Sequence, residues 1–353
     1  MHFLSTMSER LGDGWRALPK PVRWLLTAAF VGFLAILPML TIPVLNTPDS
    51  DFPTLLFDKI GLYVLMGIGL NVVVGKAGLL DLGYVAFFAI GAYTMAQMGV
   101  LLHWSFWVIL PIGLLLAMVS GMLLGLPTLR LRGDYLAIVT MGFGEIIRIT
   151  ALNTNWLGAS RGIPNIPWPS AVGPLDFSDL LNPKPFYWLL LALIILVIFL
   201  LRRLDRSRVG RAWEAIREDE DAAELMGVQT LKYKLWAFSI GAGIGGLGGV
   251  LFAAKASFIS PDNFPLTLSV MFIAIVVLGG SGHVPGVILG AIAVSYLPER
   301  LRGFTEYRVL MFGAALVIMM NLRPQGLLPR RVRGRVAVEQ PGERIRGEGP
   351  ENA

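Results

Sequence analysis

A succession of long apolar runs constrains this chain more than any other feature. Seven runs lie near 24–45, 57–75, 79–102, 105–128, 135–152, 186–201 and 235–254, followed by a longer region at 266–298 and a last run at 307–322. A helix that crosses a bilayer needs about 20 predominantly apolar residues. Backbone groups in lipid have to be hydrogen-bonded within the segment, which helices achieve. The sequence therefore predicts an all-α polytopic integral membrane protein.

The apolar region 266–298 is long enough to cross a membrane twice, and a glycine-rich segment at 279–286 divides it. Counting this region as two crossings gives about ten transmembrane or re-entrant helices. We expect the membrane part to cover residues 24–322, between an N-terminal tail at 1–23 and a C-terminal tail at 323–353. The C-terminal tail alternates Arg and Glu with Gly and Pro, which predicts disorder.

The positions of the basic residues predict the orientation of the chain. Formal net charge is +6, from 30 Lys and Arg against 24 Asp and Glu. The cations gather in both tails and in the segment 202–234, which holds eight, whereas 153–185 holds only Arg161 and Lys184. Cytoplasmic loops of membrane proteins are enriched in Lys and Arg. We therefore expect both termini and residues 202–234 to be cytoplasmic and 153–185 to be a periplasmic loop of a bacterial inner-membrane protein. Topology then explains the basic charge without a nucleic-acid partner.

Two glycine patterns resemble enzyme motifs in the wrong context. Residues 158–162 match a nucleophile elbow but lie in a Pro-rich loop, and residues 241–246 match a dinucleotide fingerprint but lie inside an apolar run. Gly241, Gly245 and Gly249 recur every four residues, which predicts close packing of one helix face.

Other enzyme signals are absent from the sequence. A phosphate-binding loop is missing, the chain has no Cys, and its 3 His are scattered. We expect no catalytic residues, metal or cofactor, and any ATP-driven work has to come from a partner.

Two glycine-rich interruptions are candidates for a translocation path. We call residues 75–83 the first break and residues 279–286 the second break. The second follows the first by about 204 residues with a similar glycine pattern, which suggests an internal repeat. Paired interruptions in the two halves of a transporter point to its substrate route, although ordinary loops between spans are the alternative. The candidates are Gly75, Gly78, Asp81, Gly83, Gly279 and Gly282.

Glu145 and Arg148 form the third candidate feature, inside the run 135–152. Residues three apart share a helix face. Charges inside a membrane are costly and usually face the bundle interior. Two interpretations stay open, a structural ion pair and an element of the substrate pathway.

The segment 202–234 carries the most information about partners. Residues 210–226 predict a helix whose apolar residues Trp213, Ile216, Ala223 and Met226 share a face, and Gly227 suits its end. That face can pack on its own bundle, on lipid or on a cytoplasmic partner. Seven acidic against eight basic residues in this segment disfavour a lipid-seeking helix.

The motifs of this segment resemble those of a known transporter family. Residues 221–227, Asp-Ala-Ala-Glu-Leu-Met-Gly, resemble the Glu-Ala-Ala-x-x-x-Gly loop by which permeases of ABC importers dock their ATPases. Residues 210–218 resemble the LivM-type permeases of branched-chain amino-acid importers, and so do 78–83, 91–93, 129–140, 143–148 and 323–328. The chain departs from the family's motifs at two positions. Asp221 replaces the Glu of the docking loop, and Asp81 stands where such permeases usually carry Ser.

The resemblance implies a permease subunit for branched-chain, hydrophobic amino acids in the bacterial inner membrane. It also implies a second related permease, two cytoplasmic ABC ATPases and a periplasmic amino-acid-binding protein, in contact with membrane lipid. The ATPase-docking residues it implies are Arg211, Trp213, Arg217, Asp221, Ala222, Ala223 and Gly227.

Three alternatives remain at this point. Permeases for urea and short amides, or for other amino acids, are similar in sequence. A secondary transporter or channel needs an ion site or filter of its own, for which Asp81 and Glu145 are the plausible carboxylates. Such a protein would leave the segment 202–234 unexplained.

Overall fold

The computed structural model describes residues 19–39, 52–129, 131, 134–171, 176–177 and 184–300, with isolated positions at 313–314, 317, 321 and 326–327. The predictions for the tails 1–23 and 323–353 and for the run 307–322 therefore lie almost wholly outside the described residues.

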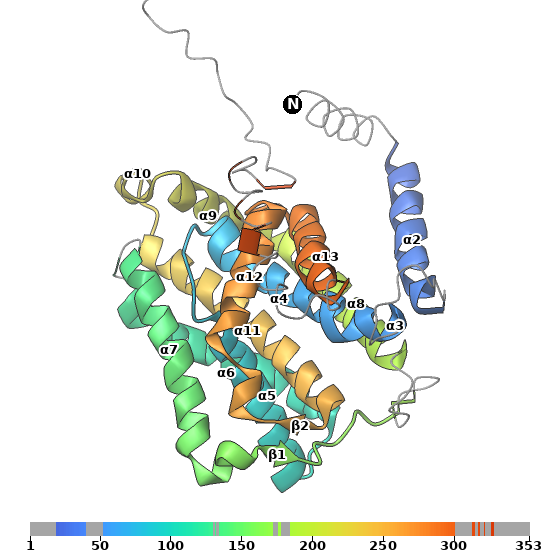
Figure 1. The fold of residues 1–353 in the computed structure, drawn as a ribbon. Helices are drawn as coiled ribbons and strands as arrows, with labels where there is room; N and C mark the ends of the chain where they lie inside the picture. Colours follow the sequence, from blue (N-terminus) through green and yellow to red (C-terminus); the bar gives the residue numbers. More distant parts are fainter. Residues whose placement is uncertain are drawn as a thin grey trace, which may run out of the picture.

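The described chain is almost entirely helical (Figure 1). Its longer helices are α2 (Lys20–Ile36), α5 (Tyr84–Leu101), α6 (Phe106–Thr128), α7 (Asp134–Asn153), α8 (Lys184–Asp205), α9 (Arg208–Glu218), α11 (Thr230–Ala256), α12 (Leu266–Gly279) and α13 (Val284–Arg300). Ahead of α5, consecutive helical segments are α3 (Phe52–Leu55), the π-helical η3 (Leu56–Gly61), α4 (Leu62–Leu70) and the π-helical η4 (Asn71–Lys76). The short elements are η1 (Leu37–Met39), η5 (Asn155–Leu157), η6 (Ala159–Arg161), β1 (Ile163–Pro164), α10 (Glu220–Leu225), β2 (Phe258–Ile259) and η7 (Pro261–Asn263).

Seven helical segments of the described chain are long and apolar enough to cross a membrane: Lys59–Lys76, Tyr84–Leu101, Phe106–Thr128, Tyr135–Asn153, Lys184–Asp205, Thr230–Ala256 and Pro261–Gly279. Two further helices, α2 and α13, have 17 residues each. The prediction of an all-α polytopic membrane protein is confirmed. The predicted number of about ten spans is only approximate, since the described residues hold seven candidate spans.

The apolar region 266–298 folds as a helical hairpin, as its glycine-rich division predicts. A β-carbon on Gly279 would collide with the carbonyl of Gly286, and one on Gly290 with the carbonyl of Ile275. These two contacts fix α12 and α13 side by side and antiparallel. The turn between them, residues 280–283, is the irregular part of the second break.

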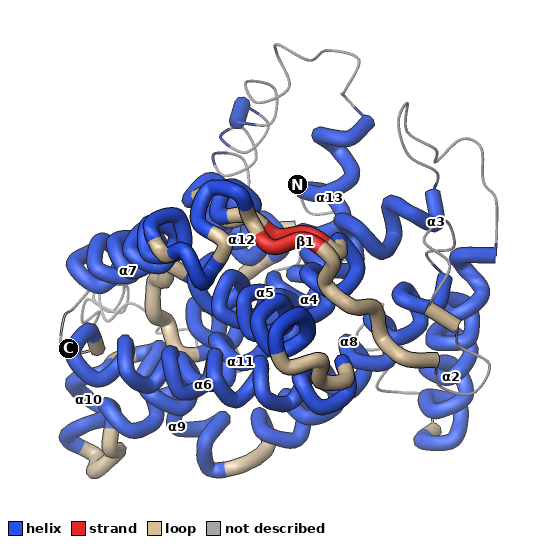
Figure 2. Tube along the Cα trace, turned by 90° about the horizontal axis from the view of Figure 1, so that it is seen from below, coloured by secondary structure: helices blue, strands red, loops and turns tan. Residues whose placement is uncertain are grey.

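Helix α11 lies at the centre of the bundle, and 89% of its membrane-spanning window is buried (Figure 2). A β-carbon on Gly241 would lie 3.1 Å from the carbonyl oxygen of Gly69 in α4, and one on Gly249 would collide with the carbonyl of Phe88 in α5. A β-carbon on Gly245 would lie 3.3 Å from the ring of Tyr84. The predicted glycine face is therefore a helix-packing face, which lets α4 and α5 approach the α11 backbone closely.

The two ends of the bundle differ in what joins the helices. We call the end that carries residues 206–229, between α8 and α11, the loop side. At the opposite end β1 pairs with β2 in antiparallel fashion, which ties the segment after α7 to the segment after α11 (Figure 1). The hydroxyl of Tyr187, at the start of α8, donates to the carbonyl of Leu34 (2.9 Å). This contact places the end of α2 at the opposite end and its first residues toward the loop side.

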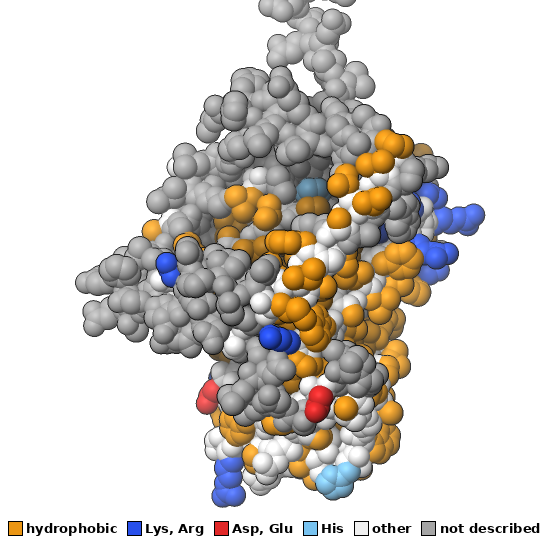
Figure 3. All heavy atoms as spheres, turned by 90° about the vertical axis from the view of Figure 1, so that its right-hand side faces the viewer, with side chains coloured by type: hydrophobic (Ala, Val, Ile, Leu, Met, Phe, Trp, Pro, Cys, Tyr) orange, Lys and Arg blue, Asp and Glu red, His pale blue; other side chains and the backbone are white. Residues whose placement is uncertain are grey.

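The outer surface of the bundle is apolar. On the face shown in Figure 3, hydrophobic side chains predominate over the described surface and charged ones are few. Helix α6 exposes large apolar side chains along its length, among them Leu115, Leu123 and Leu126. Such a surface suits contact with lipid or with other membrane subunits.

Candidate functional site at the loop side of the bundle

Residues 206–229, which we call the long loop, fold into two short helices where the sequence predicted one. Helix α9 ends at Glu218, and Asp219 adopts an extended conformation before α10 (φ −157°, ψ 111°). The carboxylate of Asp219 accepts a hydrogen bond from the amide of Ala222 (3.0 Å) and so caps α10. Gly227 ends the pair of helices with φ +85°, as its position predicted.

The apolar face of α9 packs on this chain itself. Trp213 is 1% exposed, and its indole nitrogen donates to the carbonyl of Tyr233 in α11 (2.7 Å). Ile216 and Ala223 are buried too. Of the three coverings that the sequence left open for this face, the structure shows the chain's own bundle. Trp213 and Ala223, to which the resemblance gives a docking role, are thus covered by this chain itself. Lys234 of α11 adds an ion pair with Glu220 at 2.5 Å.

The apolar groups that the loop does present to its surroundings are Leu225 and Met226, which are 88% and 85% exposed. Arg211, Asp221 and Ala222 are exposed on the same loop. The sequence predicted that Met226 continues the apolar face of Trp213, Ile216 and Ala223, but the structure buries those three and exposes Met226. Sequence reasoning missed Leu225, which lies off that face. Two adjacent large apolar residues beside a predicted glycine stop were the available signal.

The first break begins at Gly75, in the last turn of helix η4, which ends at Lys76. Gly75 is buried, whereas Gly78 is exposed with φ +73°. A β-carbon on Gly83 would collide with the carbonyl of Thr140, so a glycine allows α5 to start directly against α7. These contacts make the break an ordered, packed segment rather than a loose connection.

Asp81 lies inside the first break and is fully buried. One of its carboxylate oxygens accepts from the amide of Gly83 (2.9 Å), and its Oδ2 has no hydrogen-bond partner among the described residues. Burial raises the pKa of Asp81 to about 7, against the opposing effect of hydrogen bonds from Gly83 and Thr140. Asp81 is therefore a buried acid whose pKa lies near neutral pH, well above that of an ordinary aspartate.

The two breaks touch each other. The amide of Gly282 donates to the side-chain oxygen of Asn71 (2.7 Å), and a β-carbon on Gly75 would collide with that same amide. Gly279 packs within the α12–α13 hairpin instead. Sequence reasoning missed Asn71, whose signal was an amide side chain in an apolar run.

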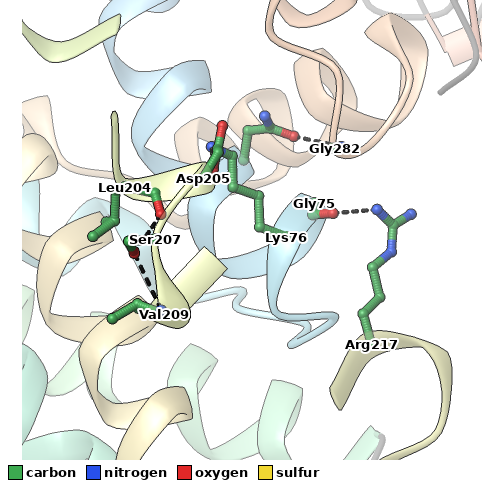
Figure 4. Close-up of polar contacts among 9 residues, drawn as sticks. Gly75, Lys76, Leu204, Asp205, Ser207, Val209, Arg217 and Gly282 are labelled. Atoms are coloured by element: carbon green, nitrogen blue, oxygen red, sulfur yellow. Dashed lines mark hydrogen bonds and ion pairs between the residues drawn. The ribbon is translucent and has the colours of Figure 1, made fainter. Parts of the chain in front are cut away.

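Two cationic side chains, Lys76 of the first break and Arg217 of α9, join the first break to the segment that includes the end of α8 and the long loop (Figure 4). Lys76 forms an ion pair with Asp205 at the end of α8 (2.5 Å). Arg217, at the end of α9, donates to the carbonyl of Gly75 and to the hydroxyl of Ser281, the latter at 3.0 Å. The structure therefore turns Arg217 inward, whereas the resemblance implied a docking role.

The C-terminal motif also reaches the second break. The amide of Leu327 donates to the carbonyl of Leu278 at the end of α12 (2.7 Å). Gly326 has φ +81°, and a β-carbon there would lie 2.6 Å from the Cα of Gly280. Segments around 75, 217, 281 and 326 thus meet at the loop side.

Glu145 and Arg148 pair with each other on α7, with the closest nitrogen–oxygen distance at 2.5 Å. Their side chains are 40% and 26% exposed, on a helix that also exposes Ile138 and Ile146. Thr140, which contacts the first break, lies about two turns before Arg148 on the same helix. The structure thus shows the pair but brings it to neither break.

The described residues contain no group of three or more His, Cys, Asp or Glu placed to hold a metal ion.

Comparison with known proteins identifies the family. Residues 54–320 match the model of the branched-chain amino acid transport system permease component. The chain belongs to this family. It is 47% identical over 289 residues to the LivM permease protein of the high-affinity branched-chain amino acid transport system of Escherichia coli K12, covering 76% of this chain and 68% of that protein. The LivM protein of Salmonella typhimurium LT2 is 46% identical with the same coverage.

A second type of permease is also similar to this chain. The LivH permease protein of the Escherichia coli K12 system is 26% identical over 292 residues, which cover 76% of this chain and 91% of that protein. No solved structure matches this chain. As a member of the family the chain is a multi-pass membrane permease subunit, and its relatives are transport proteins rather than enzymes.

Proposed function

We propose that this chain is the LivM-like permease subunit of an ABC importer and forms part of the path by which branched-chain amino acids cross the inner membrane. The observation that carries the proposal is the identity of 46–47% to LivM proteins over 76% of this chain. The family model matches residues 54–320, which include both breaks and the long loop. ATP hydrolysis takes place on separate subunits, and a periplasmic binding protein delivers the substrate.

The substrate is tested by reconstitution. The chain is co-expressed with a LivH-like permease, the two ATPases and the binding protein of its own gene neighbourhood, and the complex is placed in proteoliposomes. We expect ATP-dependent uptake of labelled leucine, isoleucine or valine. Uptake of urea or a short amide in their place, with no competition by leucine, would refute the branched-chain assignment.

We propose that the ATPase binds the outer surface of α10 and the adjoining residues Leu225 and Met226. Two exposed, adjacent apolar side chains on a charged loop suit the buried centre of an interface, with Arg211 and Asp221 at its rim. Burial of a Leu or Met side chain contributes about 1.5–3 kcal/mol, so each change to Ser should weaken binding about tenfold or more.

The docking surface is tested by co-purification. The variant Leu225→Ser/Met226→Ser should lose the ATPase from the purified complex while the permease keeps its yield and thermal stability. Arg202→Gln, an exposed change at the end of α8, is the matched control and should retain the ATPase. Retention of the ATPase by the double variant would show that docking occurs elsewhere.

The second permease is proposed to cover α7. Only 28% of the membrane-spanning window of α7 is buried, and an ion pair lies on its exposed surface. Lipid is a poor neighbour for such a pair, because charges within a membrane are costly unless they meet protein or water. A LivH-like partner that packs here would place Glu145 and Arg148 at the boundary between the subunits.

The proposed orientation places the loop side in the cytoplasm. It is supported by the basic residues of the long loop and by α2, whose first residues lie toward that side. Reporter fusions at Asn155, at the opposite end, and at Gln340 should report opposite sides of the membrane. The same side for both fusions would contradict the orientation.

A further inference from the structure

Arg217 contacts both breaks at once. Its guanidinium donates to the carbonyl of Gly75 in the first break and to the hydroxyl of Ser281 in the second, at 3.0 Å for Ser281. The aliphatic part of the side chain lies alongside Gly78, where a β-carbon would be 3.3 Å from Cγ. One side chain of the long loop therefore bridges two segments that lie more than 200 residues apart in sequence.

Helix chemistry explains why a cation is favourable at this place. Helix η4 ends at Lys76 and α12 ends at Gly279, so two helix C-termini point toward the breaks. The last carbonyl groups of a helix have no partner within it, and the helix dipole favours a positive charge there. The planar guanidinium carries several donors in a fixed fork, which lets it serve two acceptors together.

Helix α9 is held to the first break at both of its ends. Asp205, just before α9, pairs with Lys76, and Arg217, in the last turn of α9, binds the carbonyl of Gly75. The indole of Trp213 fixes the middle of α9 to α11. A displacement of α9 therefore stretches the Arg217 contacts unless both breaks move with it.

We propose that Arg217 is the positioning residue that transmits movement of the long loop to the two breaks. The inference rests on the proposed function, because it assigns the cause of the movement to an ATPase bound at α10. Arg217 touches neither ATP nor substrate. Its role is to make the two breaks, which already touch where Gly75 packs against the amide of Gly282, respond together.

The proposal is tested in the complete complex with Arg217→Gln and Arg217→Lys. The first variant removes the charge, and the second keeps it but cannot occupy both acceptors with the same geometry. Arg208→Gln removes an exposed cation from the same helix and is the matched control. Three quantities are measured: the ATPase retained on purification, the rate of ATP hydrolysis, and the labelled leucine taken up.

We expect both variants of Arg217 to retain the ATPase and to hydrolyse ATP, while uptake falls about tenfold or more for Arg217→Gln and less for Arg217→Lys. Two charge-assisted hydrogen bonds are lost, and each is worth a severalfold change in an equilibrium. The number of ATP molecules hydrolysed per leucine transported should therefore rise. A role in fold stability alone would lower hydrolysis and uptake together and leave this ratio unchanged.

Three outcomes would overturn the proposal. One is uptake by both Arg217 variants within twofold of Arg208→Gln, and another is an unchanged ratio of hydrolysis to uptake. The third is loss of the ATPase from both variants, which would indicate that Arg217 binds the ATPase, as the resemblance implies. If Arg217→Gln does not accumulate in the membrane, Arg217→Lys decides by the same ratio. Failure of the unmodified complex to transport leucine or bind an ATPase would instead refute the proposed function.

Discussion

Replacement of Trp213 by Ala tests whether the long loop is anchored in its own bundle. The indole is 1% exposed and its nitrogen donates to Tyr233 at 2.7 Å. If the side chain belongs to the core, its removal should loosen α9 in the isolated permease. If it belongs to a partner interface, the isolated permease should be unaffected and only ATPase binding should suffer.

The magnitude follows from what the change removes. A buried Trp truncated to Ala costs about 3–5 kcal/mol, because apolar burial is lost and a cavity remains. Since about 1.4 kcal/mol corresponds to a factor of ten, opening of α9 should become roughly 100- to 1,000-fold more frequent. Trp213→Phe keeps most of the apolar contact but loses the hydrogen bond, at a cost of about 1 kcal/mol and a severalfold effect.

The absence of cysteine from the chain provides a direct assay. A single cysteine in place of Ala212, which is 8% exposed, reacts with a thiol reagent only when α9 opens. The labelling rate is measured in the permease purified without its ATPase. Leu225→Ala, at an 88% exposed side chain, serves as the control and should leave the rate unchanged.

One result would refute the reasoning. Labelling at position 212 that stays at the unmodified rate in Trp213→Ala, together with loss of the ATPase from the complex, would show that the indole faces the partner. The docking role that the resemblance implies for Trp213 would then be supported.

Three further predictions concern the breaks and the ion pair of α7. Folded Asp81 keeps its proton up to about pH 7 whereas an unfolded aspartate loses it near pH 4, so stability should fall as pH rises through this window. Asp81→Asn should flatten that dependence, and thermal unfolding in detergent at several pH values measures it. Glu145→Leu/Arg148→Leu should leave the amount of permease unchanged but reduce uptake, and normal uptake would place this face in lipid. Gly78→Leu, at φ +73°, costs about 1–2 kcal/mol in backbone strain and should block uptake while membrane insertion and ATPase binding persist.

The helices were predictable from the sequence because the membrane imposes a length and a composition on each of them. The apolar runs, the hairpin within 266–298 and the positive φ of Gly227 follow from rules that act within a few residues. The glycine face of α11 was predictable for the same reason, since a spacing of four residues places three glycines on one side of a helix.

The contacts of the loop side were not predictable in this way. Periodicity marks Trp213 and Ile216 as one apolar face but does not identify what covers it. A bundle and an ATPase groove present the same chemistry to such a face. Likewise, the spacing of the breaks suggested a repeat, which stays a prediction, whereas the hydrogen bond from Gly282 to Asn71 depends on tertiary packing.

The packing of α11 decides where movement of the long loop can go. Helix α9 is fixed to α11 through Trp213, and α10 is fixed to it through the ion pair of Glu220 and Lys234. Helix α11 cannot shift alone, because its glycines let the backbones of α4 and α5 pack directly against it, and a close-packed core resists deformation. The breaks, in contrast, contain glycines with positive φ at positions 78, 280 and 282, whose backbone can change conformation at low cost. A displacement of α10 by the ATPase therefore either moves the central helices as one body or changes the conformation of the breaks through Arg217. If the central helices move as one body, the Arg217 variants should keep transport coupled to ATP hydrolysis. If Arg217 transmits the movement, the variants should lose that coupling.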